Sequence, residues 1–295
     1  MSVVWQPRDA AEAVRLKEYF GAAGQYVGGG TWLSVQWENG AAKPAHLIDV
    51  GGVPGVKGLF VQGAELTIGA MTPLAAARLD PVVGRCAPLL REAARHVAAP
   101  SVRNLGTVGG NVASRTGDLL PALLAADAEL LWYDGRVQAA EKLADWLERL
   151  RGGSRPDASL LLQIKTACGE AEDTKRQLAG GRVLEGYRKI GRRETFTPSV
   201  ATAAFRAAVT PAGEIRSVRL AAGGGAMLPQ RLPAAEALLL GETMRPQLME
   251  QLYDELLAEV RPAGDAFVSA EYRRQTTAAV LAAGLWQAWR ESEPA

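Results

Sequence analysis

Two glycine-rich segments constrain this chain of 295 residues more than any other feature. The first, Gly28-Gly29-Gly30, stands between a run typical of a strand, 25–27, and a run typical of a helix, 31–39. Glycine tolerates positive φ and leaves the backbone without side chains. The N–H groups of such a turn can converge on a phosphate, aided by the positive end of the following helix. A tight turn without a ligand is the alternative reading, and neither the Rossmann nor the P-loop spacing is present.

The second segment is Asn104-Leu-Gly-Thr-Val-Gly-Gly-Asn111. It falls in a stretch without periodicity, 98–117, which we interpret as a long loop; such loops in compact domains are often functional. Its three glycines let the backbone lie against a ligand, so we expect Gly109→Val to weaken ligand binding more than folding. Downstream, the Asp118 carboxylate can accept hydrogen bonds from ribose hydroxyls or an adenine amino group. Two glycine-rich loops fit a dinucleotide with two phosphates better than either does alone.

Composition excludes several other classes of protein. The chain has 33 Lys and Arg against 32 Asp and Glu, so no charge excess favours nucleic acid or an anionic membrane. Cys86 and Cys168 are too few for a four-cysteine iron–sulfur or zinc site, and we expect them to be separate buried thiols. His46 and His96 are expected to be structural or surface residues. No run is long enough to span a bilayer and the first residues do not resemble a secretory signal, which favours the cytoplasm.

The pattern of elements predicts an α+β protein in two parts. A polar connector at 169–181 marks the boundary, so we place one domain at 1–170, with two α/β lobes, and another at 180–295. The second should be an antiparallel sheet followed by three helices. Strands are expected at 25–27, 47–50, 65–70, 128–133, 160–165, 183–189, 199–209 and 215–222. Helices are expected at 10–20, 31–39, 73–79, 88–97, 143–150, 233–240, 247–260 and 269–290, with a short one opening at Asp118.

These residues carry a resemblance to a known family. Gly28-Gly-Gly-Thr31 followed by Arg103-Asn-Leu-Gly-Thr-Val-Gly-Gly-Asn111 is similar to the FAD-binding subunits of the molybdenum hydroxylases, which include xanthine dehydrogenase and carbon monoxide dehydrogenase. Tyr187-Arg-Lys-Ile-Gly-Arg-Arg193, Gly223-Gly-Gly-Ala-Met-Leu-Pro-Gln-Arg231 and Ser269-Ala-Glu-Tyr-Arg273 resemble further family motifs in the same order. The resemblance covers about residues 3 to 290. It implies an FAD domain of the vanillyl-alcohol-oxidase or PCMH type.

The resemblance also implies roles for residues. Segment 27–33 would hold the FAD pyrophosphate with backbone amides, and 106–111 would form a second wall around the pyrophosphate and flavin. Asp118 matches an acidic residue that contacts the adenosine half, and either Arg188 or Lys189 matches a basic residue near the flavin. The implied cofactor residues are Val27, Gly28, Gly29, Gly30, Thr31, Trp32, Gly106, Thr107, Gly109, Gly110, Asn111, Asp118, Leu161 and Lys189. No catalytic or metal-ligating residue is implied.

Two positions depart from the family pattern. Trp32 stands where an acidic or small polar residue is common, and Arg115-Thr116 replaces a run that contains proline.

The function that the resemblance implies is electron transfer. FAD would receive electrons from a molybdenum centre through iron–sulfur clusters and pass them to NAD or another acceptor. Separate iron–sulfur and molybdopterin subunits would be the partners. Two alternatives stay open at this point: a self-sufficient FAD-dependent oxidoreductase, such as an oxidase or an enolpyruvyl-sugar reductase, and a cofactor-free scaffold paralogue.

Overall fold

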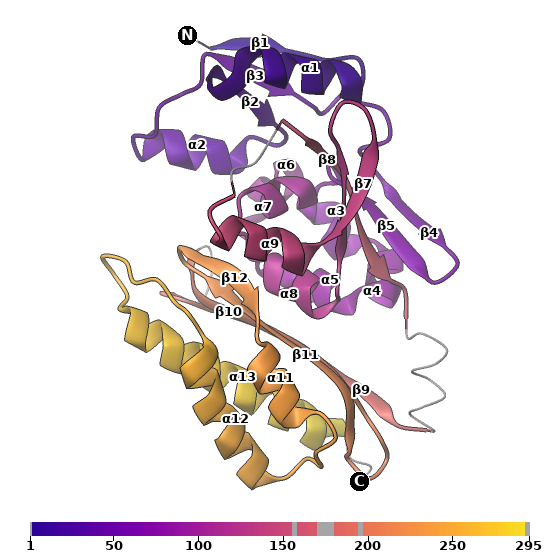
Figure 1. Ribbon diagram of the computed structural model, residues 1–295, viewed down its shortest axis with the longest axis vertical. Coiled ribbons are helices and arrows are strands. Elements are labelled where there is room, and N and C mark those ends of the chain that lie inside the picture. Colours follow the sequence, from indigo (N-terminus) through magenta and orange to yellow (C-terminus); the bar gives the residue numbers. More distant parts are fainter. Residues whose placement is uncertain (1, 155–157, 170–179, 194–196, 293–295) are drawn as a thin grey trace.

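A computed structural model describes residues 2–154, 158–169, 180–193 and 197–292. Figure 1 shows three sheets stacked along the long axis, with the N-terminus at one end. None of the helices in these ranges is long and apolar enough to cross a membrane.

The first sheet is small and parallel, in the order β1-β3-β2. Its strands are β1 (Val3–Trp5), β2 (Gly24–Val27) and β3 (His46–Asp49). Helix α1 (Ala10–Phe20) connects β1 to β2, and it begins as expected because the Asp9 side chain accepts a hydrogen bond from Glu12 N at 2.7 Å. A short 3-10 turn, η1 (Gly21–Ala23), follows α1, and α2 (Thr31–Glu38) lies between β2 and β3.

The second sheet is antiparallel, in the order β4-β5-β8-β6-β7. Its strands are β4 (Leu59–Gln62), β5 (Glu65–Gly69), β6 (Glu129–Tyr133), β7 (Gln138–Lys142) and β8 (Leu160–Ala167). Its helices are α3 (Leu74–Leu79), α4 (Pro81–Cys86), α5 (Pro88–His96), α6 (Pro100–Leu105), α7 (Val108–Ala113), α8 (Leu120–Ala125) and α9 (Leu143–Arg151). Leu160 and Leu162 of β8 also pack on the core of the first sheet, which joins the two sheets.

The stretch 98–117 is not the loop that its lack of periodicity predicted. Most of it forms α6 and α7, each only six residues long. Pro100 occupies the first position of α6, and the Thr107 hydroxyl caps α7 by accepting from Gly110 N at 3.0 Å. Helices this short show too few turns for a periodic pattern, so the capping residues were the only sequence signal.

The third sheet is an antiparallel meander, as predicted, in the order β12-β11-β10-β9. Its strands are β9 (Arg182–Gly191), β10 (Ser199–Val209), β11 (Ile215–Gly224) and β12 (Met227–Arg231). Helices α11 (Pro233–Leu239), α12 (Pro246–Glu259) and α13 (Ala270–Ser292) cover one face, while α8 and α9 lie on the side of the second sheet (Figure 1).

Strand register explains how the third sheet faces both ways. Ala204 pairs with Tyr187 on β9 and with Ala221 on β11, and all three are buried in the same core as α8. The neighbouring Ala203 and Phe205 point to the opposite face and pack in the core of α12 and α13. The third sheet therefore separates two cores and presents one face to the glycine-rich half of the chain.

The two cysteines form a disulfide, so the expectation of two separate thiols is wrong. Cys86 ends α4, and Cys168 follows β8, 82 residues further along the chain. Cys168 lies just past the end of β8, the central strand of the second sheet, and its N–H donates to Ala64 O at 2.7 Å, just before β5. Tertiary packing alone brings such distant residues together.

Candidate functional site

The two glycine-rich segments lie in contact. A Cβ added to Gly29 would stand 1.8 Å from the carbonyl oxygen of Leu105, and one added to Gly106 would stand 3.2 Å from Thr31 Oγ1. Gly28 faces the Thr107 hydroxyl in the same way, at 3.2 Å. The structure therefore brings these predicted site residues together, and at Gly29 the backbone contact leaves no room for any side chain.

The first segment has unused backbone donors. Among the described residues, no hydrogen bond is donated by the N–H groups of Gly28, Gly29, Gly30 or Thr31. Gly30 adopts φ +67° and begins α2, so these donors lie at the positive end of a helix. Free N–H groups at a helix start form a site suited to an anion such as a pyrophosphate.

The second segment uses most of its donors inside the protein. Gly109 N donates to Ala70 O at 2.7 Å, and Gly110 N donates to Thr107 Oγ1 at 3.0 Å. A Cβ at Gly109 would stand 2.6 Å from Ala70 Cβ. Packing against the end of β5 therefore requires glycine at position 109. Its N–H already donates to Ala70 O, so it is not a free donor for a pyrophosphate, contrary to our expectation.

This packing reverses the expected effect of Gly109→Val. The branched side chain would collide with Ala70, so we now expect the free energy of unfolding to fall by about 3 kcal/mol. Urea unfolding of the FAD-free chain measures this loss, with Gly52→Ala, at an exposed glycine where a Cβ meets nothing within 4 Å, for comparison. A Gly109→Val variant that unfolds like the parent but binds no FAD would instead restore the pyrophosphate role.

Asn111 connects the second segment to Asp118. Its Oδ1 accepts from Leu119 N at 3.0 Å, and Gly117 packs so closely that a Cβ there would stand 2.1 Å from the same oxygen. Arg115 adopts φ +64°, which turns the chain between these residues. The shortened run at Arg115-Thr116 thus closes a tight turn that holds Asp118 in place.

Asp118 lies at the centre of a buried polar network. Its Oδ2 is 2.7 Å from Lys189 Nζ on β9, and its Oδ1 accepts from Ser199 Oγ on β10, also at 2.7 Å. The side chains of Lys189 and Asp118 are only 9% and 14% exposed. Both carboxylate oxygens therefore have partners within the chain, which the expected adenosine contact did not anticipate.

Tyr187 and Arg188 complete this part of the site. The Tyr187 hydroxyl donates to the backbone oxygen of Asp118 at 3.0 Å. Burial, followed by the nearby carboxylates of Asp118 and Glu92, raises the pKa of Tyr187 well above its usual range, so the phenol stays protonated. Arg188 is exposed, and its Nη1 donates a hydrogen bond to Tyr187 O at 3.3 Å. Of the two basic candidates, Lys189 is the one that the structure joins to Asp118.

Three residues were missed or given no role by the sequence analysis. Tyr187 and Ser199 approach Asp118 from strands that follow it by 69 and 81 residues, so no local signal could place them there. Arg103 lies inside the second family motif, and its Nη1 donates to Val97 O at 2.8 Å and to Ala98 O at 2.5 Å. Burial, and then the charge of Arg78, lower the pKa of Arg103.

Trp32 and Leu161 occupy contrasting positions. Trp32 is 46% exposed on α2, a helix with no buried residue. Leu161 is buried on β8 within the core of the second sheet. Trp32 is accessible to a ligand, whereas Leu161 contributes mainly to the core.

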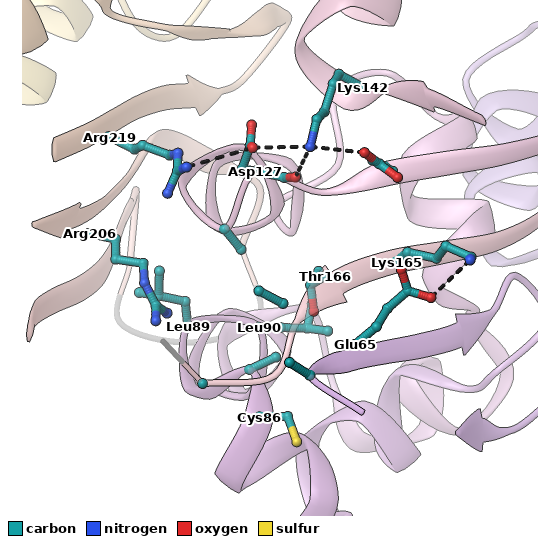
Figure 2. A pocket seen from close by; sticks show the side chains of 16 residues that line it. Glu65, Cys86, Leu89, Leu90, Asp127, Lys142, Lys165, Thr166, Arg206 and Arg219 are labelled. Atoms are coloured by element: carbon teal, nitrogen blue, oxygen red, sulfur yellow. Dashed lines mark hydrogen bonds and ion pairs between the residues drawn. The ribbon is translucent and has the colours of Figure 1, made fainter. Parts of the chain in front are cut away.

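A cavity of about 330 Å³ lies elsewhere, between the second and third sheets (Figure 2). Lys142 bridges Asp127 at 3.1 Å and Glu129 at 3.0 Å, and Arg219 approaches Asp127 at 3.6 Å. Burial opposes the charge of Lys142, but hydrogen bonds to Glu129 and Asp127 raise its pKa. None of the predicted cofactor residues lines this cavity, and the Arg219–Asp127 pair connects β11 of the third sheet to the turn before β6 of the second.

Comparison with known proteins gives the family. Residues 1–166 match the model of the FAD binding domain in molybdopterin dehydrogenase, and residues 185–288 match the CO dehydrogenase flavoprotein C-terminal domain. The chain belongs to the family of FAD-binding subunits of the molybdenum hydroxylases. FAD is therefore its cofactor, and the free amides of the first glycine segment fit the anionic pyrophosphate of that group.

Individual relatives agree with this membership. The carbon monoxide dehydrogenase medium chain of Hydrogenophaga pseudoflava is 27% identical over 291 residues, which covers 96% of this chain and 95% of that protein. The nicotinate dehydrogenase FAD-subunit of Eubacterium barkeri is 25% identical over 84% of each chain. A solved structure of carbon monoxide dehydrogenase from Hydrogenophaga pseudoflava matches with a TM-score of 0.85 and 25% identity, covering 98% of this chain and 97% of that one. The expected α+β fold is confirmed.

Proposed function

We propose that this chain is the FAD-carrying electron-transfer subunit of a molybdenum-containing hydroxylase or dehydrogenase. The observation that carries the proposal is that the N–H groups of residues 28–31, at the start of α2, donate no hydrogen bond to any described residue. These groups lie against the second glycine segment, and the chain belongs to an FAD-binding family. When bound, FAD supplies reversible acceptance and donation of electrons. The residues of this chain bind and orient that group.

Each part of the site has a proposed task. The amides of 28–31 hold the pyrophosphate, and Thr107 with Asn111 lines the adjacent wall. Lys189 supplies a fixed positive charge near the flavin, and Asp118 holds that charge in place. Exposed Trp32 stands beside the pyrophosphate and limits which acceptors reach the flavin.

We further propose that the boundary between an FAD domain and a C-terminal domain falls between residues 170 and 180.

The partners follow from what the described part of the chain contains. Its two cysteines are bonded to each other, so they supply no thiolates for a cluster. Relatives carry the names medium chain and FAD-subunit, which describe one component of a larger enzyme. We propose an iron–sulfur subunit as the electron donor and a molybdopterin subunit that binds the substrate. NAD is a candidate final acceptor.

The purified full chain tests the proposal. After incubation with excess FAD and gel filtration, acid precipitation should release one yellow flavin per chain. Dithionite should bleach the bound flavin, whereas a purine or an aldehyde should not, because the centre that oxidises the substrate is proposed to lie on the molybdopterin subunit. Addition of the two partner subunits should make the flavin reducible by the substrate of the complex.

Two outcomes would favour the alternatives. A protein that stays colourless after incubation with FAD would indicate the cofactor-free scaffold. Direct bleaching by an organic substrate in the isolated chain would indicate a self-sufficient flavoenzyme.

A further inference from the structure

We propose that Ser199, at the start of β10, is a positioning residue of the FAD site that acts through Asp118 on Lys189. The inference rests on the proposed function and extends it, because it makes the C-terminal sheet a part of the cofactor site. Ser199 stands outside every motif that the sequence analysis identified.

The Ser199 hydroxyl has a defined orientation. Its Oγ accepts from Gly225 N at 3.3 Å and donates to Asp118 Oδ1 at 2.7 Å. A hydroxyl carries one proton, so the bond accepted from Gly225 leaves that proton for the carboxylate. Ser199 is only 8% exposed, so little water competes for this bond.

The backbone around Ser199 is held from the far side of the sheet. Fully buried Arg273 on α13 donates from Nη1 to the carbonyl oxygen of Val200 and pairs through Nη2 with Asp265 at 2.9 Å. Gly225 adopts φ +61°, and a Cβ there would stand 1.8 Å from Arg273 Nη1. Arg273 and Gly225 therefore fix both the strand that carries Ser199 and the donor that orients it.

The fixed carboxylate in turn fixes the ammonium. With Oδ1 bound to Ser199, Asp118 presents Oδ2 to Lys189 Nζ at 2.7 Å. Lys189 Nζ also donates to His96 O at 3.1 Å, so two acceptors define its place. Without the Ser199 hydroxyl, the Asp118 carboxylate is held by Lys189 alone, so one of the two acceptors that position the lysine is less well fixed.

Ser199→Ala tests the proposal in the full chain. A hydrogen bond to a charged group is strong, so we expect the Kd for FAD to rise about tenfold. Ser199→Thr keeps the hydroxyl and should stay within about twofold of the parent. Ser217→Ala removes an exposed serine from β11 of the same sheet and serves as the control.

A double-mutant cycle separates positioning from simple packing. If Ser199 acts through Asp118, then Ser199→Ala should change the Kd by less than about twofold in an Asp118→Ala background. The midpoint potential of the bound flavin should also become more negative in Ser199→Ala, because the positive charge of Lys189 is less well held. Thermal unfolding of each FAD-free variant reports any loss of fold.

The outcomes distinguish this inference from the proposed function. If the parent chain binds FAD and Ser199→Ala binds it equally well with an unchanged midpoint potential, the role of Ser199 is overturned. The proposed function of the chain would stand. The same tenfold loss in the Asp118→Ala background would also overturn it, because the effect would not pass through Asp118. A parent chain that takes up no FAD would overturn the proposed function, and the role of Ser199 with it.

Discussion

Gly29→Ala should lower the affinity for FAD by at least about a hundredfold, or about 2.8 kcal/mol. A methyl group at this position would stand 1.8 Å from the carbonyl oxygen of Leu105, so the two glycine segments must separate. Separation would move the free amides of the first segment away from the second glycine segment. Fluorescence titration of the FAD-free chain with FAD measures the change.

Gly52→Ala is the matched control for this variant. Gly52 lies in the turn after β3, has no positive φ, and a Cβ there meets nothing within 4 Å. It should bind FAD like the parent. Equal affinity in Gly29→Ala and the parent would show that the contact between the segments does not shape the cofactor site.

Lys189→Met should lower the free energy of unfolding by about 3 kcal/mol. The change leaves the Asp118 carboxylate without its cation in a place where both side chains are nearly inaccessible to water. Guanidinium unfolding of the FAD-free chain measures the loss. Lys57→Met, at an exposed lysine, should stay within about 0.5 kcal/mol of the parent.

A paired variant separates stability from cofactor binding. Asp118→Asn combined with Lys189→Met removes both charges, so it should regain most of the stability lost in Lys189→Met. The paired variant should bind FAD more weakly than the parent, because it lacks the positive charge of Lys189 that we propose lies near the flavin. Full recovery of FAD affinity in the paired variant would contradict the role of Lys189 in the site.

Local signals in the sequence determined most of the elements. The carboxylate of Asp9 begins α1, Gly30 begins α2, and the alternation of Leu66 and Ile68 marks β5. Helices α11, α12 and α13 end within a few residues of their expected limits. Each of these features depends on residues within one or two turns of the chain, so the sequence contains it. The first glycine segment is of the same kind, because its free amides follow from its own backbone.

Only the tertiary structure decided how those segments are used. Gly109 resembles a ligand-facing glycine in sequence, yet the packing of α7 against Ala70 makes it a core residue. Asp118 meets Lys189 and Ser199 only because strands β9 and β10 pair in one register beside α8. Such contacts join residues about 70 to 80 positions apart, and their free energy depends on burial and on the geometry of the partner. Sequence patterns record the period of an element but not which face of another element it will meet.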